Sequence, residues 1–168
     1  QDSLIIDVNQ ELILAYQTIK KDVDSLIKSL SILEKKYLAK KQEERKDFFY
    51  ETRETFNNNL EKIDFVHFSD TWIERAQQLI FLNKTCFNGL FRVNSKGGFN
   101  VPFGDHKNPK ICHDGNLRNV SDILQKTNIQ KGDYSISESF IDSETFVYFD
   151  PPYRPLNKTS SFTSYSKF

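Results

Sequence analysis

The chain has little of what metal centres and membrane spans require. Its 168 residues include no methionine, only two cysteines and three histidines. Cys86 and Cys112 are too few and too widely spaced for a metal site, and the histidines have no ligand-like spacing, so we predict two reduced thiols and no bound metal. A membrane-spanning helix needs about 20 consecutive apolar residues. Because no such run occurs, the sequence predicts no membrane span.

The chain also lacks net charge, which at first argues against a nucleic-acid partner. The charges are unevenly distributed, however: residues 83–118 carry six Lys or Arg against two Asp, whereas residues 119–153 carry two Lys against six Asp or Glu. Phosphate binding depends on a local basic face rather than on the total charge. Residues 83–118 are therefore the candidate nucleic-acid-binding segment.

The most informative pattern lies near the end of the chain. Residues 145–149 are uncharged and rich in aromatic and β-branched side chains, which predicts a buried strand. Asp150 follows at the carboxyl end of this strand, where open α/β sheets bind their ligands. Pro151 and Pro152 then stiffen the turn that precedes Tyr153. These four residues alone are equally compatible with an ordinary turn between a strand and a loop.

An acid, a fixed backbone carbonyl and an aromatic ring in this order suit the methylation of an exocyclic amine on a nucleobase. A carboxylate and a carbonyl that accept the two amine hydrogens would free the nitrogen lone pair and stabilise the positive charge that develops on it. A base in a duplex must flip out to reach such a site, and Tyr153 offers a ring for it to stack on.

The start of the chain resembles half of a nucleotide-binding α/β unit. Residues 4–6 predict a short buried strand, and Asn9 is a plausible N-cap for a helix that follows. Asp7, between them, stands where an acid can bind ribose hydroxyls, although an acid in an ordinary turn fits the same pattern. Further helices are expected over residues 22–59, with a turn inside the charged segment 34–47, and over residues 70–80 and 117–124.

Residues 90–102 predict a β-hairpin. Two short runs, 90–93 and 99–102, flank the Gly-containing segment 94–98. A hairpin with basic and aromatic side chains can enter the major groove of DNA, although a solvated hairpin packed on one face is an alternative.

Two blocks together resemble the Dam-type DNA adenine methylases, the adenine-N6-specific family that carries the Asp-Pro-Pro-Tyr motif. One block is residues 150–156 with 159–165, and the other is residues 83–94 with 99–104; both have the family's order and approximate spacing. The resemblance implies an α/β fold, an incomplete Rossmann-like methyltransferase sheet with an inserted, mainly helical target-recognition domain that carries the hairpin. We expect residues 1–20 and 119–168 to form the split methyltransferase domain and residues 21–118 to form the inserted domain.

The resemblance also assigns roles to individual residues. The implied catalytic motif is Asp150, Pro151, Pro152 and Tyr153. The implied S-adenosylmethionine-binding residues are Asp7, Asp133, Tyr134 and Asp150. Phe87 matches the aromatic residue that inserts beside the target base pair, Asn88 a polar residue at the target, and Arg92 the arginine that contacts a guanine. The remaining expected DNA contacts are Leu90, Asn94, Lys96 and Pro102.

These assignments predict an enzyme that transfers a methyl group from S-adenosylmethionine to adenine in double-stranded DNA, within GATC and with the adenine flipped out. Such an enzyme would act in the cytoplasm of a bacterial-type cell, either beside a restriction enzyme or alone. The family's glycine-rich cofactor loop upstream of Asp7 is absent, so we expect the chain to be part of a larger protein. A non-catalytic DNA-binding fragment is therefore an alternative. Methylation of a cytosine or glutamine amine is a third hypothesis, which Asp150 disfavours.

Overall fold

The computed structural model describes residues 3–150 of the chain. Its α-helices are α1 (Gln10–Lys21), α2 (Val23–Leu38), α3 (Gln42–Asn58), α4 (Asp70–Thr85) and α5 (Asp114–Leu124). Its strands are β1 (Ser3–Asp7) and β2 (Thr127–Lys131). Short 3-10 helices are η1 (Leu60–Lys62), η2 (Phe87–Gly89) and η3 (Tyr134–Ser139).

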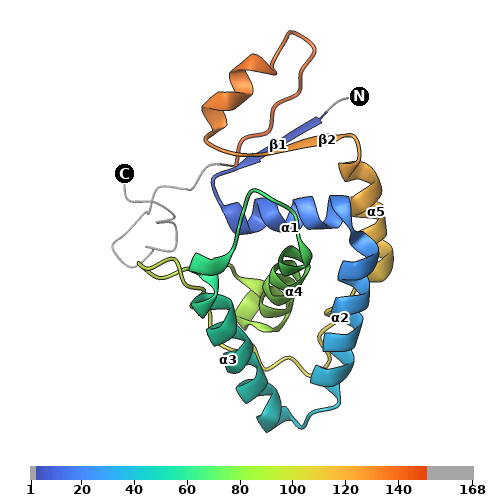
Figure 1. The fold of residues 1–168 in the computed structure, drawn as a ribbon, viewed down its shortest axis with the longest axis vertical. Helices are drawn as coiled ribbons and strands as arrows, with labels where there is room; N and C mark the ends of the chain where they lie inside the picture. The colour runs from blue at the N-terminus through green and yellow to red at the C-terminus, as the bar shows by residue number, and fades with distance from the viewer. Residues whose placement is uncertain (1–2, 151–168) are drawn as a thin grey trace.

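The two strands pair in parallel although they come from opposite ends of the described chain. Ser3 is opposite Thr127 and Asp7 is opposite Lys131. Helix α1 packs against both strands, and α5 leads directly into β2 (Figure 1). The α/β class and the parallel sheet are thus confirmed, while the division into 1–20 with 119–168 and 21–118 remains a prediction.

The helices begin where the sequence offers side-chain caps. The side chain of Asn9 accepts a hydrogen bond from the backbone N–H of Glu11 (3.0 Å), which confirms the predicted N-cap of α1. Asp22 caps α2 in the same way through the N–H of Ser25 (3.0 Å). The predicted turn within residues 34–47 separates α2 from α3 at residues 39–41.

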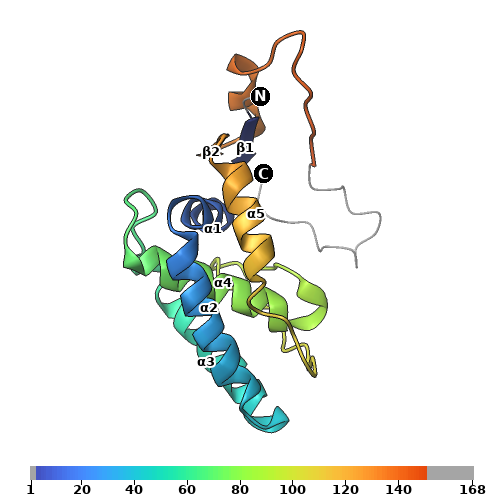
Figure 2. The same cartoon turned by 90° about the vertical axis from the view of Figure 1, so that its right-hand side faces the viewer.

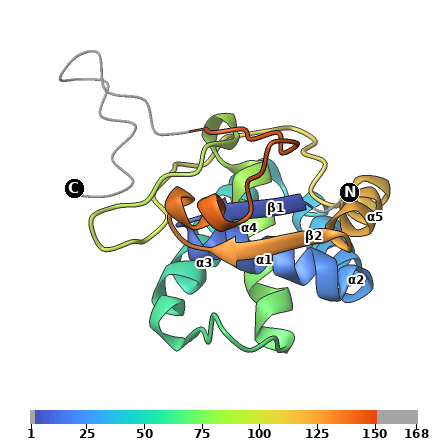
Figure 3. The ribbon, with the colours of Figure 1, turned by 90° about the horizontal axis from the view of Figure 1, so that it is seen from above.

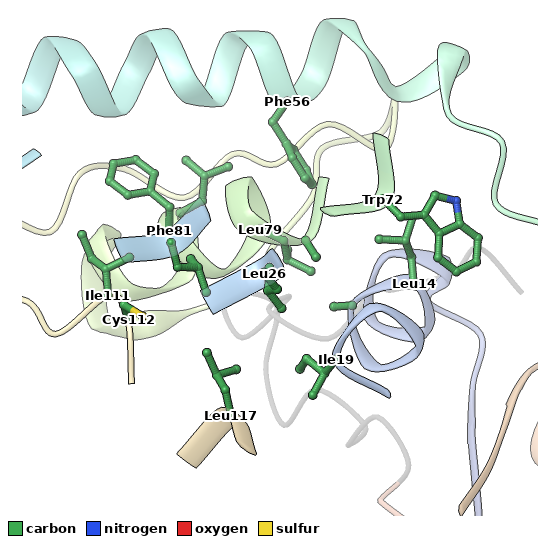
Figure 4. Packing of buried hydrophobic residues seen from close by; sticks show 14 of the residues in the cluster. Leu14, Ile19, Leu26, Phe56, Trp72, Leu79, Phe81, Ile111, Cys112 and Leu117 are labelled. Carbon is green, nitrogen blue, oxygen red and sulfur yellow. The ribbon is translucent and has the colours of Figure 1, made fainter. Parts of the chain in front are cut away.

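Helix α4 is the centre of the helical body. It packs against α1, α2 and α3, which surround it in Figures 1 and 2. Its buried residues Leu79 and Phe81 belong to a single apolar core that also contains Leu14 of α1 and Leu26 of α2 (Figure 4). Because one core includes residues from both ends of the described chain, the sheet and the helical body are held together by continuous packing.

The predicted hairpin is present, but it is short. Val93 and Phe99 form a single antiparallel bridge, and the N–H of Asn94 donates to the carbonyl of Gly98 (2.8 Å). Gly97 has a φ of +80°, a left-handed conformation that glycine adopts without strain. In Figure 3 the hairpin is the yellow-green loop that projects from the body at the left.

One predicted strand is not formed, and one strand of the structure was not expected. Residues 145–149 do not form the expected buried strand: within residues 3–150 they pair with no other segment, and Phe146 is 88% exposed. A strand of this composition is buried only between neighbouring strands, and the described sheet consists of β1 and β2 alone. Strand β2, in contrast, was not predicted, because its sequence alternates apolar and polar residues over only five positions.

Candidate functional site

Asp7 lies at the carboxyl end of β1, as the sequence predicts. Its Oδ1 accepts a hydrogen bond from the backbone N–H of Asn9 (2.7 Å), and its carbonyl accepts one from Gly132 (3.1 Å). The first of these bonds fixes the carboxylate beside the N-terminus of α1. The second links the end of β1 to the segment that follows β2.

Asp133 and Tyr134 lie at the same edge of the sheet, because the carboxyl ends of parallel strands meet there. Asp133 caps η3: its carboxylate accepts a hydrogen bond from the N–H of Ser135 (3.0 Å). That N–H holds the pKa of the Asp133 carboxyl below its usual value. Tyr134 is 67% exposed, so its ring is available to a ligand.

The segment that leads to the predicted catalytic motif returns toward this edge. The rings of Tyr134 and Phe149 meet edge to face, with centroids 5.9 Å apart. Asp150 is the next residue and is exposed. The structure thus brings the neighbourhood of Asp150 to the end of β2, while Pro151, Pro152 and Tyr153 lie outside the described residues.

Phe87, Asn88, Leu90 and Pro102 come together on one surface. The N–H of Phe87 donates to the carbonyl of Pro102 (2.9 Å), which places these two residues side by side. Phe87 is 51% and Leu90 39% exposed. Asn88 has a left-handed φ of 54°, which asparagine tolerates better than most residues. Four of the expected DNA contacts therefore lie together on one exposed surface, formed by residues 87–90 and Pro102.

Cys86 is buried beneath this loop. Its thiol donates weakly to the carbonyl oxygens of Asn83 and Leu90, and burial raises its pKa. A buried thiol with a raised pKa is a poor nucleophile, so Cys86 stabilises the loop rather than reacting.

The hairpin side chains are held in defined positions. Arg92 donates from Nε to Oδ1 of Asn100 (2.7 Å) and from Nη2 to its carbonyl (3.1 Å). Within the part of the chain that the structure describes, its Nη1 has no partner, and this group remains available to a ligand. Asn94 accepts hydrogen bonds from the N–H groups of Lys96 (2.9 Å) and Gly98 (3.0 Å), so its side chain already stabilises the turn. Lys96 is exposed at the tip.

Two residues of α3 hold the hairpin in place, a role that the sequence did not indicate for either of them. The side chain of Asn57 donates to the carbonyl of Phe99 (3.0 Å) and accepts from its N–H (2.8 Å). Arg53 stacks on Tyr50 and donates to the carbonyl of Val101 (3.2 Å). Neither role has a local sequence signal, because both contacts reach more than 40 residues along the chain.

The sheet edge and the hairpin lie on the same side of the molecule. Figures 1 and 3 both show β1 and β2 pointing toward the side on which the hairpin projects. A ligand at the carboxyl ends of the strands and a duplex on the hairpin would therefore approach the protein from one side.

Comparison with known proteins identifies the family. The model of the D12 class N6 adenine-specific DNA methyltransferases matches residues 1–168. The chain belongs to this family. It is 52% identical, over 98% of its length, to the Type II methyltransferase M.MjaIII of Methanocaldococcus jannaschii, and 32% identical, over 97%, to the DNA adenine methylase of Vibrio cholerae. It spans 55% and 53% of these two relatives, about half of each.

Two further findings concern the described residues. No helix within residues 3–150 is long and apolar enough to cross a membrane. In the same range, no three His, Cys, Asp or Glu side chains gather in the manner of a metal site. The polar groups at the sheet edge and on the hairpin are instead single carboxylates, amides and cations.

Proposed function

We propose that the complete protein containing this chain methylates the N6 amine of adenine in double-stranded DNA, with S-adenosylmethionine as the donor. The observation that carries this proposal is that two surfaces lie on the same side of the molecule, the carboxyl edge of the sheet and the hairpin (Figures 1 and 3). Asp7 ends β1 and Asp133 and Tyr134 follow β2 at that edge, while the hairpin includes Arg92 and Lys96. Family membership supplies the reaction class. The similarity to Dam-type enzymes makes GATC the expected target sequence.

The sheet edge suits the nucleoside part of the donor. The Asp7 carboxylate, with one oxygen held by the N–H of Asn9, can accept hydrogen bonds from ribose hydroxyls. The exposed ring of Tyr134 and the carboxylate of Asp133 at the same edge would contact the adenine ring. The donor supplies an electrophilic methyl group when bound, and these residues orient it.

Asp150 is proposed as the catalytic acceptor. Its carboxylate and a neighbouring backbone carbonyl would accept hydrogen bonds from the two N–H groups of the target amine, which frees the nitrogen lone pair for attack. As the bond from nitrogen to the methyl group forms, the bond from sulfur to the methyl group would break, S-adenosylhomocysteine would leave, and the amine would give up one proton through Asp150 to water. Positive charge develops on that nitrogen in the transition state, and a preorganised negative group stabilises it. Tyr153 would provide the ring on which the flipped adenine stacks, and Pro151 and Pro152 complete the proposed motif.

DNA recognition is assigned to the hairpin and the adjoining loop. Phe87, exposed and fixed by its backbone bond to Pro102, would occupy the space left beside the target base pair. Asn88 would contact the target, and Leu90 and Pro102 would make apolar base contacts. Arg92 would donate to a guanine, and Lys96 at the exposed tip would contact phosphate. Asn94 would act through the turn that its side chain holds together.

The decisive experiment replaces Asp150 by asparagine in the complete protein. The shape is kept and the negative charge is removed, so single-turnover methylation of a cognate duplex should slow by about a hundredfold or more. Duplex binding, measured in parallel, should change much less. Asp142→Asn is the matched control, because Asp142 is an exposed carboxylate in the same segment whose hydrogen bonds are local. Methylation at the wild-type rate by Asp150→Asn would show that the proposed role is wrong.

A second function, DNA binding without catalysis, is favoured for the chain in isolation by one observation. Phe146, Tyr148 and Phe149, which precede Asp150, are 88%, 78% and 55% exposed. The described residues thus leave the approach to Asp150 open to water. Methylation assays on the isolated chain and on the complete protein, each with the cognate duplex, would separate the two functions.

A further inference from the structure

A buried ion pair joins the first turn of α1 to the middle of α4. Arg75 donates from Nε (2.9 Å) and from Nη2 to the two carboxylate oxygens of Glu11. Arg75 is 2% and Glu11 7% exposed. Burial of two charges carries a large desolvation cost, which is offset only when the geometry is good and the remaining polar atoms are satisfied. The Nη1 of Arg75 donates to the carbonyl of Phe56, so the guanidinium meets this condition.

On one side, the pair is connected to the cofactor edge of the sheet. The N–H of Glu11 donates to Oδ1 of Asn9 (3.0 Å), and the N–H of Asn9 donates to Oδ1 of Asp7 (2.7 Å). One short turn therefore links the Asp7 carboxylate to the backbone of Glu11, from which the paired side chain extends.

On the other side, the pair is connected to the hairpin. The guanidinium of Arg75 lies over the ring of Phe56, 3.4 Å from its centroid, and Phe56 meets Phe99 edge to face at 6.5 Å. The next residue, Asn57, holds both backbone groups of Phe99. Phe99 pairs with Val93, next to Arg92. Arg75 is thus connected, through Phe56, to Phe99 at the base of the hairpin.

A fork of two hydrogen bonds fixes direction as well as distance, whereas an apolar contact at the same place would allow rotation. We propose that Glu11 and Arg75 are positioning residues that couple the two surfaces, so that cofactor binding and duplex binding strengthen each other. This inference rests on the proposed function, because it takes Asp7 as part of the cofactor site and the hairpin as the DNA contact. By reciprocity, each ligand must change the affinity of the other by the same factor.

The test measures, in the complete protein, the factor by which a bound cofactor changes the affinity for duplex DNA. The dissociation constant of a GATC duplex is measured with and without saturating S-adenosylhomocysteine, a product that binds without reacting. For the wild type we expect the duplex to bind more tightly with the product present, by about tenfold, within the usual range of coupling between sites. In Glu11→Leu/Arg75→Met, which removes both charges and keeps similar volumes, the factor should fall to within about twofold of one.

Three further variants keep the test decisive. Asn57→Ala breaks the same connection at the hairpin, so it should lower the factor equally, and adding it to the double variant should cause no further loss. Arg75→Lys keeps the charge but loses the planar fork, and it should not restore coupling. Gln77→Met is the control, because Gln77 also lies on α4 and donates to another helix, at the carbonyl of Ser29 (2.8 Å), away from the Arg75 contacts.

The possible outcomes distinguish failure of this inference from failure of the proposed methyltransferase function. Failure of the complete protein to bind either ligand would contradict the proposed function. Binding of both ligands with no coupling in the wild type would overturn the inference alone, as would full coupling in folded Glu11→Leu/Arg75→Met or in Asn57→Ala. Equal loss in Gln77→Met would show that any disturbance of α4 has this effect. Should the double variant not fold, Asn57→Ala and Arg75→Lys decide the matter.

Discussion

Tyr37 has the one buried side-chain oxygen or nitrogen in the described chain that lacks a hydrogen-bond partner. Its ring is fully buried, in edge-to-face contact with Phe81 and under the guanidinium of Arg45. Burial raises the pKa of its hydroxyl, since the charged form would be desolvated. The Tyr37 ring therefore stabilises the core, whereas its hydroxyl lowers the stability of the protein, because it loses its hydrogen bonds to water on folding and gains none among the described residues in return.

Replacing Tyr37 by phenylalanine should leave the free energy of unfolding unchanged or raise it by about 1 kcal/mol, since removal of an unsatisfied buried group relieves its desolvation cost. Urea unfolding of the two proteins measures the difference. Thr18→Val is the matched control: Thr18 is equally buried, but its hydroxyl donates to the carbonyl of Leu14 (2.8 Å). That change should cost about 0.5–1.5 kcal/mol. A large loss in Tyr37→Phe would reveal a partner for the hydroxyl.

The loop that carries Phe87 depends on a close approach between the backbones of residues 85–87 and 102–104. The N–H of Gly104 donates to the carbonyl of Thr85 (2.9 Å), and a Cβ on Gly104 would lie only 2.6 Å from the carbonyl carbon of Cys86. Gly104→Ala should therefore displace the Cys86–Phe103 bridge and destabilise the protein by about 1–3 kcal/mol, as overpacking does.

Gly115 provides the opposite case. It lies within α5, and a Cβ there would meet no atom within 4 Å. Gly115→Ala should stabilise the protein by about 0.5–1 kcal/mol through a lower entropy of the unfolded chain. Thermal unfolding of both variants tests the pair of predictions. Similar effects of the two substitutions would show that the approach of Gly104 to Cys86 is not required.

The hairpin makes a prediction about specificity. A guanidinium that donates to both acceptors of guanine contributes about 1–3 kcal/mol of discrimination. In the complete protein, Arg92→Ala should thus methylate duplexes with that guanine replaced nearly as well as the intact site. Lys96→Ala should instead weaken binding evenly across sequences and lower its dependence on salt. Single-turnover methylation of duplexes altered one base pair at a time measures both.

The control for this experiment is Arg118→Ala, because Arg118 is an exposed cation that pairs with Asp24 and Asp114. It should leave both specificity and salt dependence unchanged. If Arg92→Ala loses activity uniformly with its guanine preference intact, Arg92 serves the hairpin through Asn100 and the sequence is recognised elsewhere.

The sequence predicted those elements that have a local cause. The N-cap Asn9, the helices expected over residues 22–59, 70–80 and 117–124, and the Gly-containing turn at residues 94–98 are set by neighbouring residues, and the structure has all of them. The strand at 145–149 was predicted wrongly, because burial of a strand depends on neighbours far along the chain. Arg75 lies among the buried apolar residues of α4. A charged residue at such a position indicates a buried partner of opposite charge, which the structure identifies as Glu11.

At the scale of the whole molecule, the candidate cofactor site is open. Tyr134 and Phe149 are largely exposed, and Asp133 is exposed at the end of a sheet that has two strands within residues 3–150. Ligand sites normally bury most of a small ligand. The isolated chain should therefore bind S-adenosylmethionine much more weakly than the complete protein. Calorimetry on both measures the difference, and equal tight affinities would show that the described edge is sufficient.

The attachment of the hairpin has a consequence for how such proteins diversify. Asn57 bonds to the backbone of Phe99, and Arg53 bonds to the carbonyl of Val101, so these bonds from α3 reach the main chain of the hairpin rather than its side chains. Substitutions at positions 92 or 96 leave these bonds in place. On the role proposed for Arg92, a change at that position can therefore alter the target sequence while the bonds from α3 that hold the hairpin remain.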